Sequence, residues 1–202
     1  MIVDLPFCLL TFWDRIQPFD SWLITHINQD WGNSFFDTVL PYMRETLFWV
    51  PLYLFLLLFV TSNFGIKGWW WVIGVVLCAA LSDLISSQFI KKTIWRTRPC
   101  RDEIMGPQLR FFINYCPGSS SFTSSHATSH FAQAMFFFTT LRPVMGRWAN
   151  LFLVWAFIIS YTQVYVGVHY PFDVFCGALL GCGIGLMLSK LFHNRIGMLT
   201  VS

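Results

Sequence analysis

The sequence predicts an all-α integral membrane protein, a bundle of about five transmembrane helices preceded by an amphipathic helix at the membrane interface. Of the 202 residues, 55% are hydrophobic and only 11% are charged, whereas a soluble domain usually carries about a quarter charged residues. The mean hydropathy is +0.57. We therefore expect residues 1–202 to form a single domain that the lipid bilayer surrounds.

Residues 1–45 are expected to form an amphipathic segment that lies in the membrane interface. Its apolar residues recur at helical spacing: Phe19, Trp22, Leu23, Ile27 and Trp31. Its polar residues fall largely between them: Asp20, Thr25, Gln29 and Asp30. Such a segment is too polar to span the bilayer, but its apolar face can rest at the headgroup boundary.

Residues 46–195 are expected to form the helical bundle, because long uncharged runs alternate here with charges and tight turns. The predicted spans are residues 46–64, 68–90, 124–141, 148–168 and 172–189. The stretch from Gly65 to Gly68 predicts one tight reversal, and Arg142-Pro143 through Arg147 predicts another. With this topology, the ends of the second and fourth spans and the starts of the third and fifth share one membrane face.

Small residues recur on one face of the fifth span. Gly177, Gly181 and Gly185 follow one another at every fourth position, a spacing that lets two helix backbones approach closely. Two interpretations stay open: packing against another helix of the bundle, or a seam between two copies in a homodimer.

Two cations stand at the end of the second span. Lys91 and Arg98 are separated by about two helical turns, so both side chains can face the same direction. A lysine and an arginine together can hold phosphate oxygens, the arginine through paired hydrogen bonds. An ordinary basic flank of a membrane span is the alternative.

The third span opens with Ser124-Ser125-His126. Serine is favoured at helix N-caps, and the free N–H groups of a helix start form an anion site. His126 would then stand beside a bound phosphate, where it can protonate the leaving oxygen. A plain capping cluster is the alternative.

His169 and Asp173 flank the start of the fifth span, where Pro171 suits the first helical position. We expect Asp173 to hydrogen-bond one ring nitrogen of His169 and leave the other free to attack phosphorus. For Asp173, a simple helix cap is the alternative.

Together these residues resemble the type 2 phosphatidic acid phosphatase superfamily, whose core is shared with vanadium haloperoxidases. The family pattern is KxxxxxxRP, then PSGH, then SRxxxxxHxxxD. The first motif is intact from Lys91 to Pro99, and the second appears as Thr123-Ser124-Ser125-His126 without its proline and glycine. The third retains its histidine and aspartate. The resemblance covers about residues 80–185, and it implies a lipid phosphatase that works without metal or cofactor, through a phosphohistidine on His169. It also implies phosphate contacts from Lys91, Arg98, Ser125 and Gln163.

Gln163 departs from the family pattern, because it stands where the family places a phosphate-binding arginine. A glutamine donates a hydrogen bond but carries no charge, so transition-state stabilisation would fall by a few kcal/mol. Three basic residues are candidates to replace the charge: Lys92, Arg96 and Arg101. A catalytically weakened lipid-phosphate binding or transport protein on the same scaffold is the alternative function.

Cys100 and Cys116 bracket the loop between the first two motifs. On an oxidising face of the membrane they would form a disulfide; two free thiols are the alternative. This pair and the resemblance to bacterial envelope proteins favour a bacterial inner membrane with the active site on the non-cytoplasmic face.

The expected partners are the lipid bilayer and a lipid phosphate. Four substrates stay open: phosphatidic acid, phosphatidylglycerol phosphate, a polyprenyl diphosphate and a lipid A phosphate. The net charge of +3 is small and spread along the chain without a basic run, so nucleic acid is not an expected partner.

Overall fold

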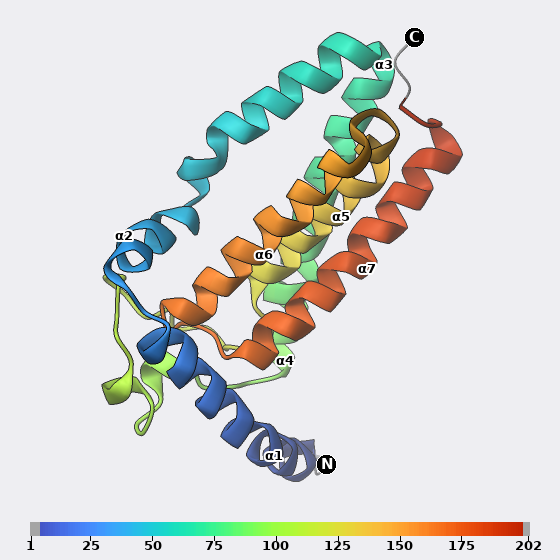
Figure 1. The fold of residues 1–202 in the computed structure, drawn as a ribbon. Helices are drawn as coiled ribbons and strands as arrows, with labels where there is room; N and C mark the ends of the chain where they lie inside the picture. The colour runs from blue at the N-terminus through green and yellow to red at the C-terminus, as the bar shows by residue number, and fades with distance from the viewer. Residues whose placement is uncertain (1–4, 200–202) are drawn as a thin grey trace.

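The computed structural model describes residues 5–199, and all of the regular secondary structure in that range is helical. The longer helices are α1 (Leu5–Thr25), α2 (Ser34–Met43), α3 (Val50–Asp83), α5 (Ser125–Met145), α6 (Asn150–Tyr165) and α7 (Pro171–Arg195). Short helical turns join them: η1 (His26–Asp30), η2 (Thr46–Trp49), η3 (Leu84–Ile90), α4 (Lys91–Thr93), η4 (Pro99–Arg101), η5 (Gly106–Gln108) and η6 (Gly146–Ala149). Figure 1 shows the long helices running side by side, with α1 at one end of the bundle.

Among residues 5–199, three continuous helical stretches are long and apolar enough to cross a membrane: Thr46–Thr93, Ser125–Tyr165 and Pro171–Arg195. The first two stretches each contain a reversal. Gly65 adopts a φ of 52° inside α3, a conformation that glycine tolerates best, and the helix turns back there (Figure 1). The turn η6 reverses the chain between α5 and α6. Five helices therefore run along the bundle, as the sequence predicts.

The glycine face of α7 packs against α5. A methyl group built on Gly181 would lie 2.3 Å from the carbonyl oxygen of Thr128, and one on Gly185 would lie 2.3 Å from that of Ala132. Such distances are far inside van der Waals contact, so only glycine permits this approach. Packing within the bundle is the correct interpretation of the stripe. The homodimer seam is wrong for this face, because α5 already occupies it.

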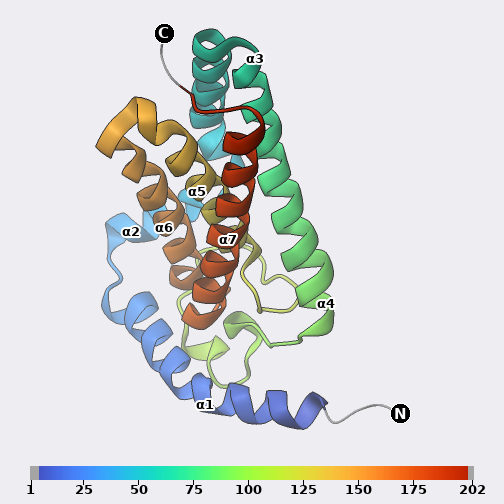
Figure 2. The ribbon, with the colours of Figure 1, turned by 90° about the vertical axis from the view of Figure 1, so that its right-hand side faces the viewer.

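The helix α1 crosses the end of the bundle beneath α7, as Figures 1 and 2 show from two directions. Phe19 and Trp22 are exposed, whereas Ile24 and Ile27 pack into the protein. Asp20, expected on the polar side of an amphipathic helix, is fully buried. It faces the bundle because a buried arginine there binds its carboxylate. The placement of this helix in the membrane interface stays a prediction.

Asn28 fastens the N-terminal segment to the rest of the chain. Its side-chain amide donates to the carbonyl oxygens of Tyr165, at 2.7 Å, and of Arg110, at 2.9 Å. The Arg110 guanidinium in turn pairs with Asp37 of α2 at 3.0 Å. These contacts join η1, α2, the loop after α4 and the end of α6, so the N-terminal helices cover this end of the bundle.

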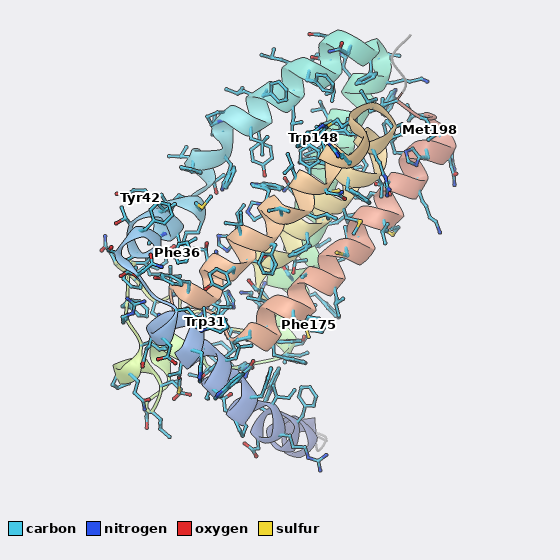
Figure 3. The ribbon with its side chains drawn as sticks, viewed as in Figure 1. Trp31, Phe36, Tyr42, Trp148, Phe175 and Met198 are labelled. Carbon is cyan, nitrogen blue, oxygen red and sulfur yellow. A yellow bond between two sulfur atoms is a disulfide. The ribbon has the colours of Figure 1, made fainter. Side chains whose placement is uncertain are left out.

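Exposed aromatic side chains lie at both ends of the molecule. Trp31 and Phe36 project at the end near α1 and α2, and Trp148 projects at the opposite end (Figure 3). Tryptophan in particular is enriched where a membrane protein meets the headgroups. These residues at the two ends fit a bundle whose axis runs across the membrane.

Candidate active site

The three predicted motifs meet at the end of the bundle that α1 covers. They surround a cavity of about 270 Å³. Its walls are Arg44, Ser87, Lys91, Arg98, Tyr115, Pro117, Ser119, Ser125, His126, Gln163, Val168 and His169. Every residue that the sequence assigned to catalysis or phosphate binding lines this cavity, except Asp173.

The start of α5 carries Ser125 and His126 into the cavity wall. Ser124 is the N-cap, as predicted, and its hydroxyl oxygen accepts a hydrogen bond from the backbone N–H of Ala127 at 3.4 Å. The hydroxyl groups of Ser125 and Ser87 lie 2.9 Å apart. The first helical turn of α5 and the hydroxyls of two serines therefore border the same space.

His169 is held in the short connection between α6 and α7. Its backbone N–H donates to the carbonyl oxygen of Gln163 at 3.2 Å, and Pro171 begins α7 two residues later, as predicted. The Nη1 group of Arg98 donates to Nε2 of His169 at 3.0 Å. Nε2 is then an acceptor, so the proton of the neutral ring sits on Nδ1. Burial, reinforced by the charges of Arg98 and Lys91, lowers the pKa of His169 well below its usual value.

Asp173 does not hydrogen-bond His169 directly, contrary to the expectation from sequence. Its Oδ2 atom lies 4.0 Å from Nδ1, and Ser121 stands between them. The Ser121 hydroxyl donates to Oδ2 at 2.5 Å and lies 3.5 Å from Nδ1. The carboxylate also caps α7, accepting the N–H of Tyr170 at 3.2 Å. The direct contact is lost because other donors hold Asp173, and the serine connects it to the ring.

The strongest of these donors is Arg96, which is buried and points away from the cavity. Its guanidinium binds Asp173 and Asp20, each at 2.6 Å. The rings of Trp13 and Tyr170 lie 4.4 and 4.2 Å from its central carbon, close enough for cation–π attraction. Arg96 therefore links α1 to the start of α7 and is not free to bind a phosphate.

The other cations expected to replace the missing charge also lie elsewhere. Arg101 is exposed and donates to the carbonyl oxygen of Cys116 at 3.1 Å, and Lys92 is exposed as well. Neither lines the cavity. The three candidate replacements from the sequence are thus wrong as cavity residues.

Arg98 and Lys91 carry positive charge into the cavity, as predicted. All five N–H groups of Arg98 are engaged: with Ser119, Ser120, Val168 and the Nε2 atom of His169. Burial lowers the pKa of Arg98 to about 10, so it stays protonated at neutral pH. The Lys91 ammonium donates to the carbonyl oxygen of Ser120 at 3.2 Å, and an ammonium has three donors.

Comparison with known proteins agrees with this arrangement. The model of the PAP2 superfamily matches residues 68–197. The chain belongs to the PAP2 superfamily. It is 32% identical over 165 residues to a lipid A 4'-phosphatase of Bacteroides thetaiotaomicron, covering 80% of this chain and 72% of that protein. An undecaprenyl-diphosphatase of Sulfolobus acidocaldarius is 31% identical over 148 residues, which cover 72% of this chain and 64%, less than two thirds, of that protein.

A solved structure shares the fold. The transmembrane PAP2-type phosphatidylglycerolphosphate phosphatase from Bacillus subtilis superposes with a TM-score of 0.68, over 95% of this chain and 96% of the other, at 19% identity. The present chain is accordingly an integral membrane lipid phosphatase of the PAP2 family.

Gln163, the departure from the PAP2 pattern, is fully buried in the cavity wall. Its Nε2 group donates to the carbonyl oxygen of Ile159 at 3.4 Å, and in the described residues its Oε1 atom has no hydrogen-bond partner. The side chain brings a dipole to the cavity but no charge.

Arg44 is the cavity residue that the sequence reasoning missed. It directly follows α2 and is only 6% exposed. The topology held the signal: if the first span starts near residue 46, that start lies on the same face as the starts of the third and fifth. A basic residue just before a span passes for an ordinary membrane flank, so it drew no attention.

The structure pairs Cys100 with Cys116, whose Cα atoms lie 6.1 Å apart. The bridge closes the loop that carries Tyr115 to the cavity, and Pro117 and Ser119 follow directly. In the described residues, no group of three or more His, Cys, Asp or Glu side chains is arranged to hold a metal ion.

Proposed function

We propose that this chain hydrolyses a lipid-linked phosphate, a phosphomonoester or a diphosphate, through a phosphohistidine on His169 and without a metal ion. One contact carries the proposal: Arg98 donates to the Nε2 atom of His169 in the wall of a cavity that His126 and Lys91 also line. The lone pair of a neutral, buried imidazole and the cations that would orient a phosphate are thus in one place.

In the first step Arg98 turns its Nη1 N–H from Nε2 of His169 to the phosphate. The freed lone pair of Nε2 attacks phosphorus, and the bond from phosphorus to the leaving oxygen breaks. His126 gives that oxygen a proton, while Nδ1 shares its own proton with Ser121 and, through it, with Asp173. In the second step His126 takes a proton from water, whose oxygen attacks phosphorus and releases His169 and inorganic phosphate. Lys91, Arg98, Ser125 and Gln163 contact the phosphate oxygens and stabilise the charge that develops on them.

The substrate is proposed to be a lipid because the cavity lies at one end of a membrane-spanning bundle, where a headgroup can enter while its tail stays in the bilayer. The names of the two relatives point to a lipid A phosphate and a polyprenyl diphosphate. Phosphate release by the purified protein from these two, phosphatidic acid and phosphatidylglycerol phosphate would identify the class.

The roles of the two histidines can be separated in the same assay. His169→Ala should abolish turnover and the labelled phosphoenzyme that wild type forms with a ³²P-labelled lipid phosphate. His126→Ala should matter less with an activated leaving group, which needs no proton. Equal residual rates for both variants on that substrate would contradict the assignment. Retained lipid-phosphate binding by a wild type that releases no phosphate would support the binding-protein alternative.

The disulfide supports an active site on the non-cytoplasmic face of a bacterial inner membrane, because disulfides persist in oxidising compartments. The C-terminal end of α7 lies at the end of the bundle away from α1 (Figure 1), whereas residues just before the start of α7 line the cavity. A fluorescent protein fused to the C-terminus should therefore mature in the cytoplasm. A correctly inserted fusion without fluorescence would indicate the opposite orientation.

A further inference from the structure

Among the described side chains, Arg44 is a buried cation without a counter-charge. Its Nε and Nη1 atoms are inaccessible, and neither has a hydrogen-bond partner in the part of the chain that the structure describes. Its neighbour is the ring of Tyr115, whose centroid is 6.0 Å from the guanidinium carbon, at the limit of cation–π attraction. Buried arginines are almost always paired, because an unpaired charge is costly to bury.

The surroundings of Arg44 show which partner would satisfy it. Arg44 lines the same cavity as Lys91, Arg98 and both histidines, and no aspartate or glutamate lines that cavity. The charge of Arg44 also contributes to lowering the pKa of Arg98, after the larger effect of burial. Cations that line one cavity favour an anion bound within it, and the first turn of α5, which also lines the cavity, favours an anion as well.

Arg44 can also bind a phosphate at a lower cost in existing hydrogen bonds than Arg98. All five N–H groups of Arg98 already have acceptors, so a phosphate must take one of them from the protein. Because the Nε and Nη1 groups of Arg44 are inaccessible in this conformation, the side chain must turn toward the cavity before a phosphate oxygen can reach them. That turn breaks no hydrogen bond of either group.

We propose that Arg44, from the turn between α2 and α3, binds the transferred phosphate as the third cation of the site and supplies the charge that Gln163 lacks. The proposal rests on the proposed phosphatase function and adds a residue to it. A guanidinium from another helix allows residue 163 of α6 to be neutral. The phosphate requires a positive charge and paired donors beside it, whichever helix supplies them.

The experiment uses full-length protein in detergent with a lipid phosphate that wild type hydrolyses. Arg44→Gln keeps a long polar side chain but removes the charge, and it should lower kcat/KM about 100- to 1,000-fold, as loss of one oxyanion donor does. Arg44→Lys should fall between that variant and wild type. Arg101→Ala is the matched control, an exposed arginine on the same face outside the cavity, and it should stay within about threefold of wild type (under 0.7 kcal/mol).

A second experiment moves the positive charge from residue 44 to residue 163. It tests whether Arg44 binds phosphate or only stabilises the fold. In the Arg44→Gln background, Gln163→Arg should recover at least tenfold of the lost activity, whereas in wild type the same change adds a fourth cation and should lower it. Inorganic phosphate should inhibit Arg44→Gln at a concentration at least tenfold higher than wild type. A merely structural arginine would show neither the recovery nor the change in phosphate inhibition.

The outcomes distinguish this proposal from the proposed function. Active wild type with Arg44→Gln within threefold of it overturns the role of Arg44 and leaves the phosphatase mechanism standing. If wild type hydrolyses no lipid phosphate, calorimetric binding of inorganic phosphate decides: equal affinity of wild type and Arg44→Gln overturns the proposal. Should Arg44→Gln fail to fold, inorganic phosphate must protect Arg44 of wild type from phenylglyoxal, mapped by mass spectrometry. Lack of protection overturns the proposal.

Discussion

Replacing Arg96 with alanine tests whether this residue is structural, as its contacts indicate. Arg96→Ala leaves two fully buried carboxylates, Asp20 and Asp173, without the cation that each binds at 2.6 Å. Removing one partner of a buried ion pair costs roughly 3–5 kcal/mol. For a chain of this size about 1 kcal/mol lowers the unfolding temperature by 2–4 °C, so the variant should unfold roughly 6–20 °C below wild type.

Asp20→Asn breaks the same ion pair from its other side and should cost much less. Burial raises the pKa of Asp20 despite the attraction of Arg96. A raised folded-state pKa means that stability is lost as pH rises from 3.8 through that pKa, so at neutral pH the buried charge is a burden. Asparagine removes it, can still accept the N–H of Phe172, and leaves Arg96 paired with Asp173. We expect a loss below about 1 kcal/mol.

Thermal unfolding in detergent, followed by circular dichroism, measures both variants, and phosphate release is compared at a temperature where all are folded. An Arg96→Ala protein as stable as wild type would refute the reasoning about stranded carboxylates. Equal destabilisation by both variants would place the energy in the Asp20 contact alone. A stable Arg96→Ala protein that has lost a hundredfold of its activity would make Arg96 a substrate ligand, against the structure.

Three further predictions concern the site. The C2 proton of His169 should exchange with a pH midpoint well below 6.5, because burial and the nearby cations disfavour the imidazolium; mass spectrometry of the peptide would show a midpoint at or above 6.5 if this is wrong. Without reduction, Cys100 and Cys116 should resist alkylation, and reduction should cost about 3 kcal/mol through the reopened loop, seen as a lower unfolding temperature; ready alkylation would mean free thiols. Activity should survive exhaustive chelation, and a loss that one divalent ion restores would contradict the phosphohistidine mechanism.

The helices and their reversals could be read from sequence because the signals are local. A long uncharged run indicates that lipid surrounds the segment. A glycine indicates where the chain can adopt a positive φ angle, as Gly65 and Gly146 do. Even the convergence of His126 and His169 followed from local signals, since span starts and ends on one face are fixed by counting.

The ion pairs could not be read in this way. Asp20 meets Arg96 across 76 positions, and helical periodicity assigned it to the polar side because periodicity does not say which face another segment covers. The same limit applies to Ser121, which separates Asp173 from His169, and to Arg44, whose partner-free burial exists only once α2 is folded onto the bundle. In each case the deciding quantity is a distance between segments, which no local pattern contains.

The close glycine contact between α5 and α7 fixes how far one helix can shift along the other. His126 sits at the start of α5, and His169 lies two residues before α7. The axial register of these two helices therefore sets the separation of the proposed acid and the proposed nucleophile. Each residue of slippage along a helix moves a side chain by about 1.5 Å, and a misplacement of about 1 Å can cost a hundredfold in rate. Bulk added at Gly185, about 12 Å along α7 from Gly177, would therefore detune the chemistry from a distance. Helix packing that extends from the cavity along α5 and α7 therefore sets the alignment of the two proposed catalytic histidines.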